Sequence, residues 1–288
     1  MKSLTTCIAI AFLALSTTAC SQQHSYSSGN VFGNKTIKAS KNYVTKDIRV
    51  SDFEKISLAG GQNVIYTQKP GAPKVEVYTS DNIIEVLDIR VKDNTLIIGF
   101  KKGVNVSYDK LDVRVNSQDL SGVSVAGSGD FTFTNGLKTS NDLSLSVAGS
   151  GDIKGQNLSC NDMKVSIAGS GDINTESIQC NNLKTSIAGS GDMGIKKITA
   201  ANVEASIAGS GTIVLSGTSQ EASYSIAGSG DLFADGLESK RVSSSISGSG
   251  DIKCFATDFL KVRTSGSGSV GYKGNPELDI PKKGLYKL

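Results

Sequence analysis

The sequence predicts an all-β fold, a parallel β-solenoid with about 20 residues per coil, on three observations. The tripeptide Gly-Ser-Gly recurs at a nearly constant spacing. Polar and apolar residues alternate in the Ser-Ile-Ala segment before it, which is typical of a strand. No segment of the repeat keeps a 3.6-residue apolar stripe over three turns, so a helical repeat is excluded. The eight copies, at steps of 22, 20, 20, 20, 19, 20 and 18 residues, begin at Gly127, Gly149, Gly169, Gly189, Gly209, Gly228, Gly248 and Gly266.

Four apolar positions recur in each unit, and we expect them to fill the interior. Coils of a solenoid stack at ~4.8 Å, so equivalent residues lie above one another. Each buried branched side chain contributes ~1.5–3 kcal/mol, which offsets the ordering of the backbone only when coils stack. The four columns are Val125, Val147, Ile167, Ile187, Ile207, Ile226 and Ile246; Phe131, Ile153, Ile173, Met193, Ile213, Leu232, Ile252 and Val270; Leu158, Ile178, Ile198 and Leu237; and Met163, Leu183, Val203, Val242 and Val262.

Both ends of the repeat depart from its pattern. Residues 57–64 match residues 166–173 position by position in character, so we expect a degenerate first coil and about nine coils in total. A strand-rich insertion follows, with strands expected at 75–78, 89–91, 95–100 and 111–115 and a turn at Asp93-Asn94. We expect this insertion to cap or flank the open edge of the solenoid. At the other end, Pro276 and Pro281 are expected to stop regular pairing, which makes residues 275–288 a terminal cover.

The first residues carry an export signal. Residues 1–19 form a signal peptide, in which Lys2 precedes nine apolar residues at 7–15, too few to span a ~30 Å bilayer. Cys20 follows Ala19 as in a lipobox, so we predict that Cys20 is lipidated and that residues 20–46 form a polar tether. Thr17 departs from the aliphatic residue usual in a lipobox, so plain cleavage after Ala19 stays the alternative. Residues 47–288 are then the folded domain with its C-terminal cover.

The composition narrows the possible functions. The chain of 288 residues has one histidine, His24 in the tether, so a histidine general base or a histidine-rich metal site is nearly excluded. A net charge of +3 is too small to indicate a nucleic-acid partner. No motif indicates a cofactor, because the Gly-Ser-Gly corners lack the helix or lysine of a phosphate loop.

Three segments together resemble the head GIN domain family of auto-transporter adhesins. They are the Gly-Ser-Gly-Asp repeat, the entry segment with Phe53, Gly60 and Gln68, and the close at residues 266–276. The resemblance spans roughly residues 47–285. It implies a right-handed parallel β-solenoid (β-helix) in an exported protein of the kind common in Bacteroidetes-type bacteria. It implies no catalytic residues, so it supports a fold more than a function.

An aspartate follows most of the Gly-Ser-Gly corners. We favour turn chemistry, in which each carboxylate accepts a backbone N–H and holds the corner. The alternative is a cation-binding ladder, although the calcium-binding Gly-Gly-x-Gly-x-Asp repeat has period nine, and we predict no metal site. A catalytic site would break the repeat, whereas these acids belong to it. They are Asp130, Asp152, Asp172, Asp192, Asp231 and Asp251.

Two further cysteines occupy the same position in two adjacent coils. Cys160 and Cys180 each follow their Gly-Ser-Gly by the same number of residues, which brings them within the distance range of a disulfide. Export permits oxidation, but a cysteine also fills a small core position as a thiol, so both states stay open. Cys254 lies at another phase and is expected to be unpaired.

The function predicted is a non-enzymatic cell-envelope lipoprotein that presents a solenoid surface for adhesion or ligand binding. Its expected partners are an unknown glycan or protein ligand and the outer membrane, reached through the N-terminal lipid, on a face that the sequence leaves open. The alternatives are a periplasmic structural scaffold that assembles through solenoid ends and a polysaccharide-processing β-helix enzyme.

Overall fold

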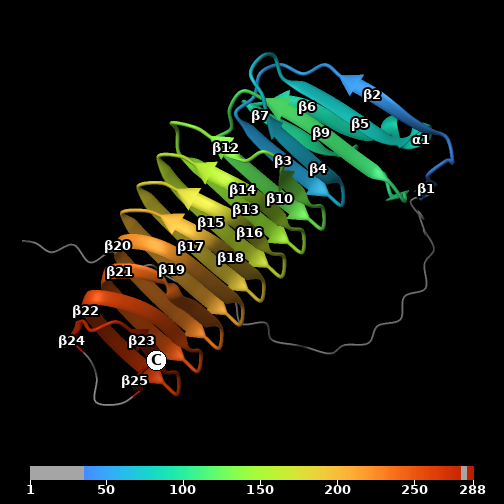
Figure 1. Ribbon diagram of the computed structural model, residues 1–288. Helices are drawn as coiled ribbons and strands as arrows, with labels where there is room; N and C mark the ends of the chain where they lie inside the picture. The colour runs from blue at the N-terminus through green and yellow to red at the C-terminus, as the bar shows by residue number, and fades with distance from the viewer. Residues whose placement is uncertain (1–35, 280–283) are drawn as a thin grey trace, which may run out of the picture. The chain divides into compact units, whose positions relative to one another are not determined.

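A computed structural model describes residues 36–279 and 284–288. It is all-β, with 69% of residues in strands and 2% in helix, and it confirms the β-solenoid and the spacing of about 20 residues (Figure 1). The solenoid has about eight turns, where the sequence predicted about nine coils. No helix in this described part is long and apolar enough to cross a membrane.

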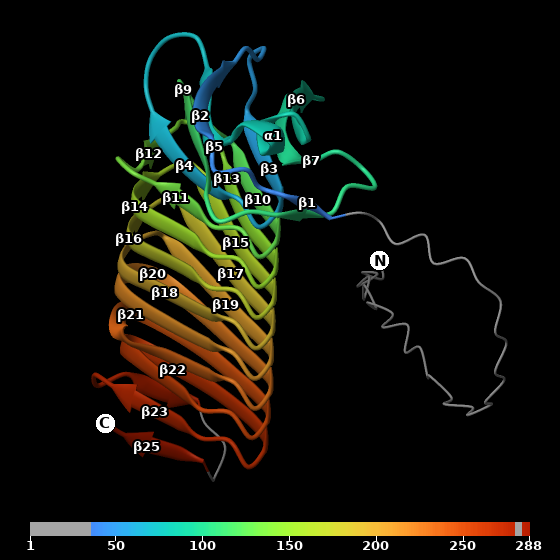
Figure 2. The same cartoon turned by 90° about the vertical axis from the view of Figure 1, so that its right-hand side faces the viewer.

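Each coil has a strand before the Gly-Ser-Gly corner and a strand after it. In one coil these are β15 (Asp162–Gly169) and β16 (Ile173–Gln179), and in the next they are β17 (Asn182–Gly189) and β18 (Asp192–Thr199). β15 pairs in parallel with β17, so that Ile167 faces Ile187. We call the strands before the corner the first face and those after it the second face; the stacked coils are visible in Figure 2.

The same two faces run through the whole repeat. The first face begins with β3 (Lys55–Gly60), β10 (Gly122–Gly127) and β13 (Leu143–Gly149) and continues to β19 (Asn202–Gly209). The second face begins with β4 (Asn63–Gln68), β11 (Phe131–Phe133), β12 (Leu137–Lys138) and β14 (Ile153–Ser159). In the later coils one long strand runs from the second face into the first, in β20 (Thr212–Gly228), β21 (Asp231–Gly248) and β22 (Ile252–Gly266).

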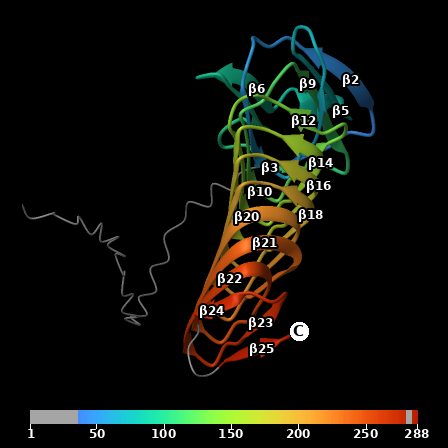
Figure 3. The ribbon, with the colours of Figure 1, turned by 60° about the vertical axis from the view of Figure 1, so that its left-hand side comes forward.

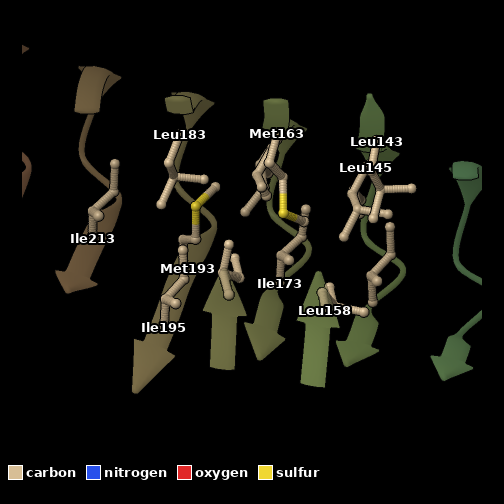
Figure 4. Close-up of a cluster of buried hydrophobic side chains, with 14 of the residues drawn as sticks. Leu143, Leu145, Leu158, Met163, Ile173, Leu183, Met193, Ile195 and Ile213 are labelled. Carbon is tan, nitrogen blue, oxygen red and sulfur yellow. The ribbon is translucent and has the colours of Figure 1, made fainter. Parts of the chain in front are cut away.

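The four apolar columns lie in the interior, as the repeat predicts. Leu143, Met163 and Leu183 stack on one side, and Ile173 and Met193 lie opposite them (Figure 4). A further interior column was not predicted, because its residues share no type: Leu145, Val165, Thr185, Ala205, Tyr224 and Ser244.

The assignment of one residue, Val262, to the fourth apolar column is wrong. Val262 pairs with Ser244, and Leu260 takes the position above Val242. The cause is a register shift between β21 and β22, where the last repeat step shortens to 18 residues.

The degenerate first coil is confirmed. β3 pairs in parallel with β10, so that Leu58 faces Val125 and Gly60 faces Gly127. β4 pairs in the same way with β11. The long segment between β4 and β10 is therefore an insertion between the first and second coils.

The insertion covers the open edge of the first coil, as expected. Its β7 (Thr95–Phe100) and β9 (Leu111–Ser117) add parallel strands to β3 and β4. Its β5 (Lys74–Ser80) and β6 (Leu87–Lys92) then pair antiparallel with β9 and β7, and β5, β6 and β9 lie together at one end of the solenoid in Figure 3. The short helix α1 (Asp81–Ile84) directly follows β5 (Figure 1). Asp93 and Asn94 have φ of 50° and 56°, so the predicted turn between β6 and β7 is confirmed.

The folded body begins before residue 47. Within the segment expected to be a tether, β2 (Tyr43–Ile48) pairs antiparallel with β5, and β1 (Ile37–Lys38) pairs with β8 (Val106–Ser107). Stacking of Tyr43 on Tyr78 accompanies the pairing, with ring centroids 5.7 Å apart. The insertion offers an edge to which these residues pair, which the repeat pattern does not reveal.

Pairing also continues past Pro276. After β23 (Val270–Lys273), β24 (Glu277–Asp279) pairs in parallel with β22, and β25 (Leu285–Lys287) pairs with β23. The expectation that Pro276 stops pairing is wrong, because a proline just before a strand removes no ladder hydrogen bond. Pro281 lies outside the described residues.

Candidate binding surface

The Gly-Ser-Gly corner depends on close approach of successive coils. Gly149 has φ of +135°, which favours glycine, and its carbonyl oxygen accepts the N–H groups of Ser170 and Gly171 at 2.9 and 3.1 Å. A Cβ on Gly171 would overlap the carbonyl oxygen of Gly151 in the coil before it. Both glycines therefore serve the fold rather than a ligand.

The predicted aspartates form a ladder at this corner. Asp152 Oδ1 accepts the N–H of Asp172 at 3.1 Å, and Asp172 Oδ1 accepts the N–H of Asp192 at 2.9 Å. The same contact recurs from Asp130 to Asp152 and from Asp231 to Asp251. Across the described ranges, no group of three or more His, Cys, Asp or Glu side chains is arranged to hold a metal ion. The geometry shows these carboxylates in the corner-holding role.

The two cysteines lie side by side in adjacent coils. Cys160 and Cys180 are free thiols with little exposure, and Cys254 is fully buried. A hydrogen bond from the Cys180 thiol lowers the pKa of Cys160. Burial raises the pKa of Cys254 to about 12. Cys20, the predicted lipid attachment residue, and the signal peptide lie outside the described residues.

Two hollows lie next to each other on the first face, in a row that crosses the strands. One of about 280 Å³ lies over β13 to β17 and one of about 630 Å³ over β17 to β22, and their linings share Asn182 and Lys184. We call the two together the axial groove. It crosses seven coils, or six spacings of ~4.8 Å, about 29 Å.

Two outward columns form the walls of the axial groove, and the buried residues between them lie beneath its floor. Wall A contains Asp142, Asp162, Asn182, Asn202, Glu221, Arg241 and Phe259. Wall B contains Ser144, Lys164, Lys184, Glu204, Ser223, Ser243 and Lys261.

Wall A is held in place by a ladder of side-chain hydrogen bonds. Asp162 Oδ1 accepts Nδ2 of Asn182 at 2.8 Å, and Asn182 Oδ1 accepts Nδ2 of Asn202 at 2.8 Å. At the far end, the guanidinium of Arg241 lies over the ring of Phe259, 5.4 Å from its centroid. Such stacked and bonded side chains lose less entropy when a ligand binds than free ones do.

The charges of the axial groove balance. Lys164, Lys184, Arg241 and Lys261 stand against Asp142, Asp162, Glu204 and Glu221. Lys184 pairs with Glu204 at 2.7 Å, and Arg241 lies 3.9 Å from Glu221. The groove therefore presents hydrogen-bonding groups of both kinds without a strong field of either sign.

A second hollow, of about 960 Å³, lies on the second face over β11 to β20. Phe133 and Ile195 lie beneath it, and Val214 at its edge is 44% exposed. Lys154 and Lys196 stand on its rim. The buried hydroxyl of Thr175, among its lining residues, has no hydrogen-bond partner. This hollow is more apolar than the axial groove.

A family model described as "Putative auto-transporter adhesin, head GIN domain" matches residues 52–213 and again residues 173–276. The chain belongs to this family. The head GIN domain thus spans the first coil, the insertion and the whole repeat. The resemblance noted in the sequence is confirmed, and the family is described as one of adhesins.

Solved structures share the head GIN architecture. One from Parabacteroides distasonis, described as a "putative lipid binding protein", is 28% identical with a TM-score of 0.70 and covers 88% of this chain and 100% of its own. A "putative adhesin" from Parabacteroides merdae is 25% identical with a TM-score of 0.68 and covers 88% of this chain and 95% of its own. A "putative adhesin" from Parabacteroides distasonis is 26% identical with a TM-score of 0.69 and covers 88% of this chain and 99% of its own. Among curated proteins, none matches this sequence.

Sequence reasoning missed both hollows of this head GIN domain. The repeated aspartates indicate a role at the corner, whereas the axial groove is built from positions whose residue types differ from coil to coil. Its one sequence signal is the polar pair that flanks the fourth apolar column, such as Asp162 with Lys164 around Met163. That signal alone does not distinguish a groove from an ordinary solvated face.

Proposed function

We propose that this protein is a non-enzymatic cell-envelope lipoprotein whose solenoid presents a surface for adhesion or ligand binding. The axial groove carries the proposal, because it is a long, walled depression on an otherwise regular sheet. Concave sites with a few fixed polar groups are the usual form of a binding site. Membership of an adhesin family supports the same function.

Binding without turnover is favoured by the repetition of the acidic side chains along the solenoid. The corner aspartates share one environment in coil after coil, so none is singled out for catalysis. An enzyme would show turnover of a polysaccharide that is abolished at one aspartate and kept at its neighbours.

Attachment to the outer membrane would come through Cys20. Metabolic labelling with a clickable fatty acid, comparing the full chain with Cys20→Ala, tests this point. Label on the wild type alone supports lipidation. Equal labelling of both proteins overturns it, and an unlabelled wild type favours plain cleavage after Ala19.

The function itself is tested by treating intact cells with a protease and probing for this protein beside a periplasmic control. Loss of the protein with the control spared supports a surface adhesin, to be followed by binding assays on glycans and extracellular proteins. Survival until the outer membrane is opened overturns surface adhesion. It favours a periplasmic scaffold, for which end-to-end oligomers would then be sought.

A second candidate function is the binding of a lipid, favoured by the second hollow. Its apolar floor and the exposed Val214 suit an acyl chain, and Lys154 and Lys196 suit an anionic head group. A relative of similar fold is described as a lipid-binding protein. Native mass spectrometry of the full chain after incubation with an anionic phospholipid tests it. A complex that is lost in Val214→Glu supports lipid binding, and no complex overturns it.

A further inference from the structure

We infer that the axial groove binds a linear, uncharged glycan laid along the solenoid axis, with about one sugar ring per coil. The inference rests on the proposed function and narrows it to one surface and one class of ligand. It follows from the direction of the groove, the repeat of its walls, the balance of its charges and the side chains left without partners.

The direction and repeat of the groove suit a glycan. The walls present a new pair of side chains at each coil, every ~4.8 Å. A pyranose ring in an extended β-linked chain advances by close to this spacing, so each ring can meet the pair of side chains that one coil presents. An extended peptide advances by only ~3.3 Å per residue and falls out of step.

The groove offers a peptide no backbone pairing either. Beneath the groove, β15, β17 and β19 are interior strands of the first face, each hydrogen-bonded to a neighbour on both sides. Strand addition needs an exposed edge, whereas the groove lies on the face of a sheet. Recognition must therefore come from the side chains of walls A and B.

The balanced charge of the walls favours an uncharged polymer. Polyanions gain affinity from cationic surfaces by releasing counterions. Here the basic side chains are offset by an equal number of acidic ones, and two of them are already paired with glutamates. A sugar hydroxyl can donate one hydrogen bond and accept another, so it suits a groove in which an acceptor on one wall faces a donor on the other. Asp162 opposite Lys164 and Glu221 opposite Ser223 are such pairs.

Several groove side chains have hydrogen-bonding capacity to spare. Asp162 uses Oδ1 for Asn182, while its Oδ2 has no donor among the described residues. In the same part of the chain, the side chains of Lys164, Ser223 and Lys261 have neither a hydrogen bond nor an ion pair. Glycan hydroxyls can satisfy these atoms without breaking the ladder that holds wall A.

An aromatic ring stands at the end of the groove nearest the C-terminus. Phe259 is half-buried, and Arg241 fixes it by lying over its ring. The C–H face of a pyranose ring packs on such an aromatic surface, as apolar faces do. A terminal sugar ring can rest there while the rest of the chain follows the polar walls.

The experiment fills the groove with a bulky side chain at its middle. Ser223 and Ser225 are both exposed on β20, two residues apart and on the same face, but only Ser223 lines the groove. Binding of the purified full chain would be measured for Ser223→Ile, whose branched side chain offers no flat ring to a sugar, for its matched control Ser225→Ile and for the wild type. The probes are neutral β-1,4-glucan and β-1,4-mannan oligosaccharides of two to eight rings, and a uronic-acid hexasaccharide.

The inference expects saturable binding of a neutral probe, with affinity rising up to about six rings and then levelling. Ser223→Ile should weaken it at least about tenfold, because the side chain fills the groove and the neighbouring polar groups lose their sugar hydroxyls, and Ser225→Ile should leave it within about twofold. Preference for the uronic-acid probe, equal effects of both variants, or no neutral glycan bound overturns it. If the wild type still binds a protein ligand, only the glycan inference has failed. If it binds nothing, the proposed function has failed too.

Discussion

The carboxylate of Asp172 accepts the backbone N–H of Asp192 from the next coil, with Oδ1 and N 2.9 Å apart. The contact needs an aspartate in only one of the two coils, because the donor is a backbone N–H: Asp192 accepts the N–H of Thr212, and Asp251 accepts that of Ser269. A side chain thus adds a hydrogen bond between coils at the corner, where the strands β16 and β18 have not yet begun their own ladder.

Removing this carboxylate should weaken the stacking of two coils. We expect Asp172→Ala to lower the free energy of unfolding by about 1 kcal/mol, and Asp172→Asn, which keeps an acceptor, to lower it by less. Urea denaturation followed by circular dichroism measures both. Calcium should leave the wild-type midpoint unchanged; an increase would instead favour a cation-binding ladder.

The second glycine of a corner should not tolerate a methyl group. In Gly191→Ala the new Cβ would overlap the carbonyl oxygen of Gly171 and lie 2.9 Å from Ile167 Cγ2. We expect a loss of at least ~3 kcal/mol or failure to fold. The control is Gly194→Ala, whose Cβ meets only the end of the Asn174 side chain at 2.6 Å, and it should cost less than ~1 kcal/mol. Equal stability of the two variants would contradict the close approach of coils.

The stability of the first coils should fall at alkaline pH through Tyr66. Burial raises the pKa of Tyr66 from 10.0 to about 12, although a hydrogen bond with Ser117 acts in the opposite direction. Because the folded pKa lies above the unfolded one, this stabilisation is complete below pH 10 and is lost as pH rises through about 12.

The variant Tyr66→Phe isolates this effect. At neutral pH it should cost about 1 kcal/mol, because the contact of 3.0 Å between Tyr66 Oη and Ser117 Oγ is lost. Denaturation midpoints from pH 8 to pH 12 should show the gap between wild type and variant narrowing as the pH rises. A constant gap would contradict the assigned pKa shift.

Oxidation should join Cys160 to Cys180. A disulfide oxidant such as oxidised glutathione would take two electrons and two protons from the pair and form one disulfide between adjacent coils. Peptide mass spectrometry would detect it, and Cys180→Ser should abolish it. Cys254, fully buried, should resist thiol reagents in the folded protein and serves as the internal control. Two reactive thiols in protein purified from the cell envelope would show that the native state is reduced.

Much of the interior could be predicted from the sequence, because coils that stack in register bring residues one repeat apart into contact. Ile167 lies against Ile187 for no other reason than a step of 20 residues. The same logic predicted the degenerate first coil from Gly60. The prediction was wrong at Val262. There the repeat is shorter, so the strand register shifts, and the residue types do not reveal that shift.

The amino-acid sequence by itself determined the class of fold, the period of the coils and four of the columns that line the core. At the phases of those four columns burial selects apolar residues in coil after coil, so these features are written as a repeat. Tertiary structure alone decided how β7 and β9 cover the first coil and how outward residues such as Asn182 and Lys184 become walls of one groove. Residues that point outward are free to vary, and an unpaired strand edge can accept several partners. The binding surface is therefore defined only when folding brings these residues close together.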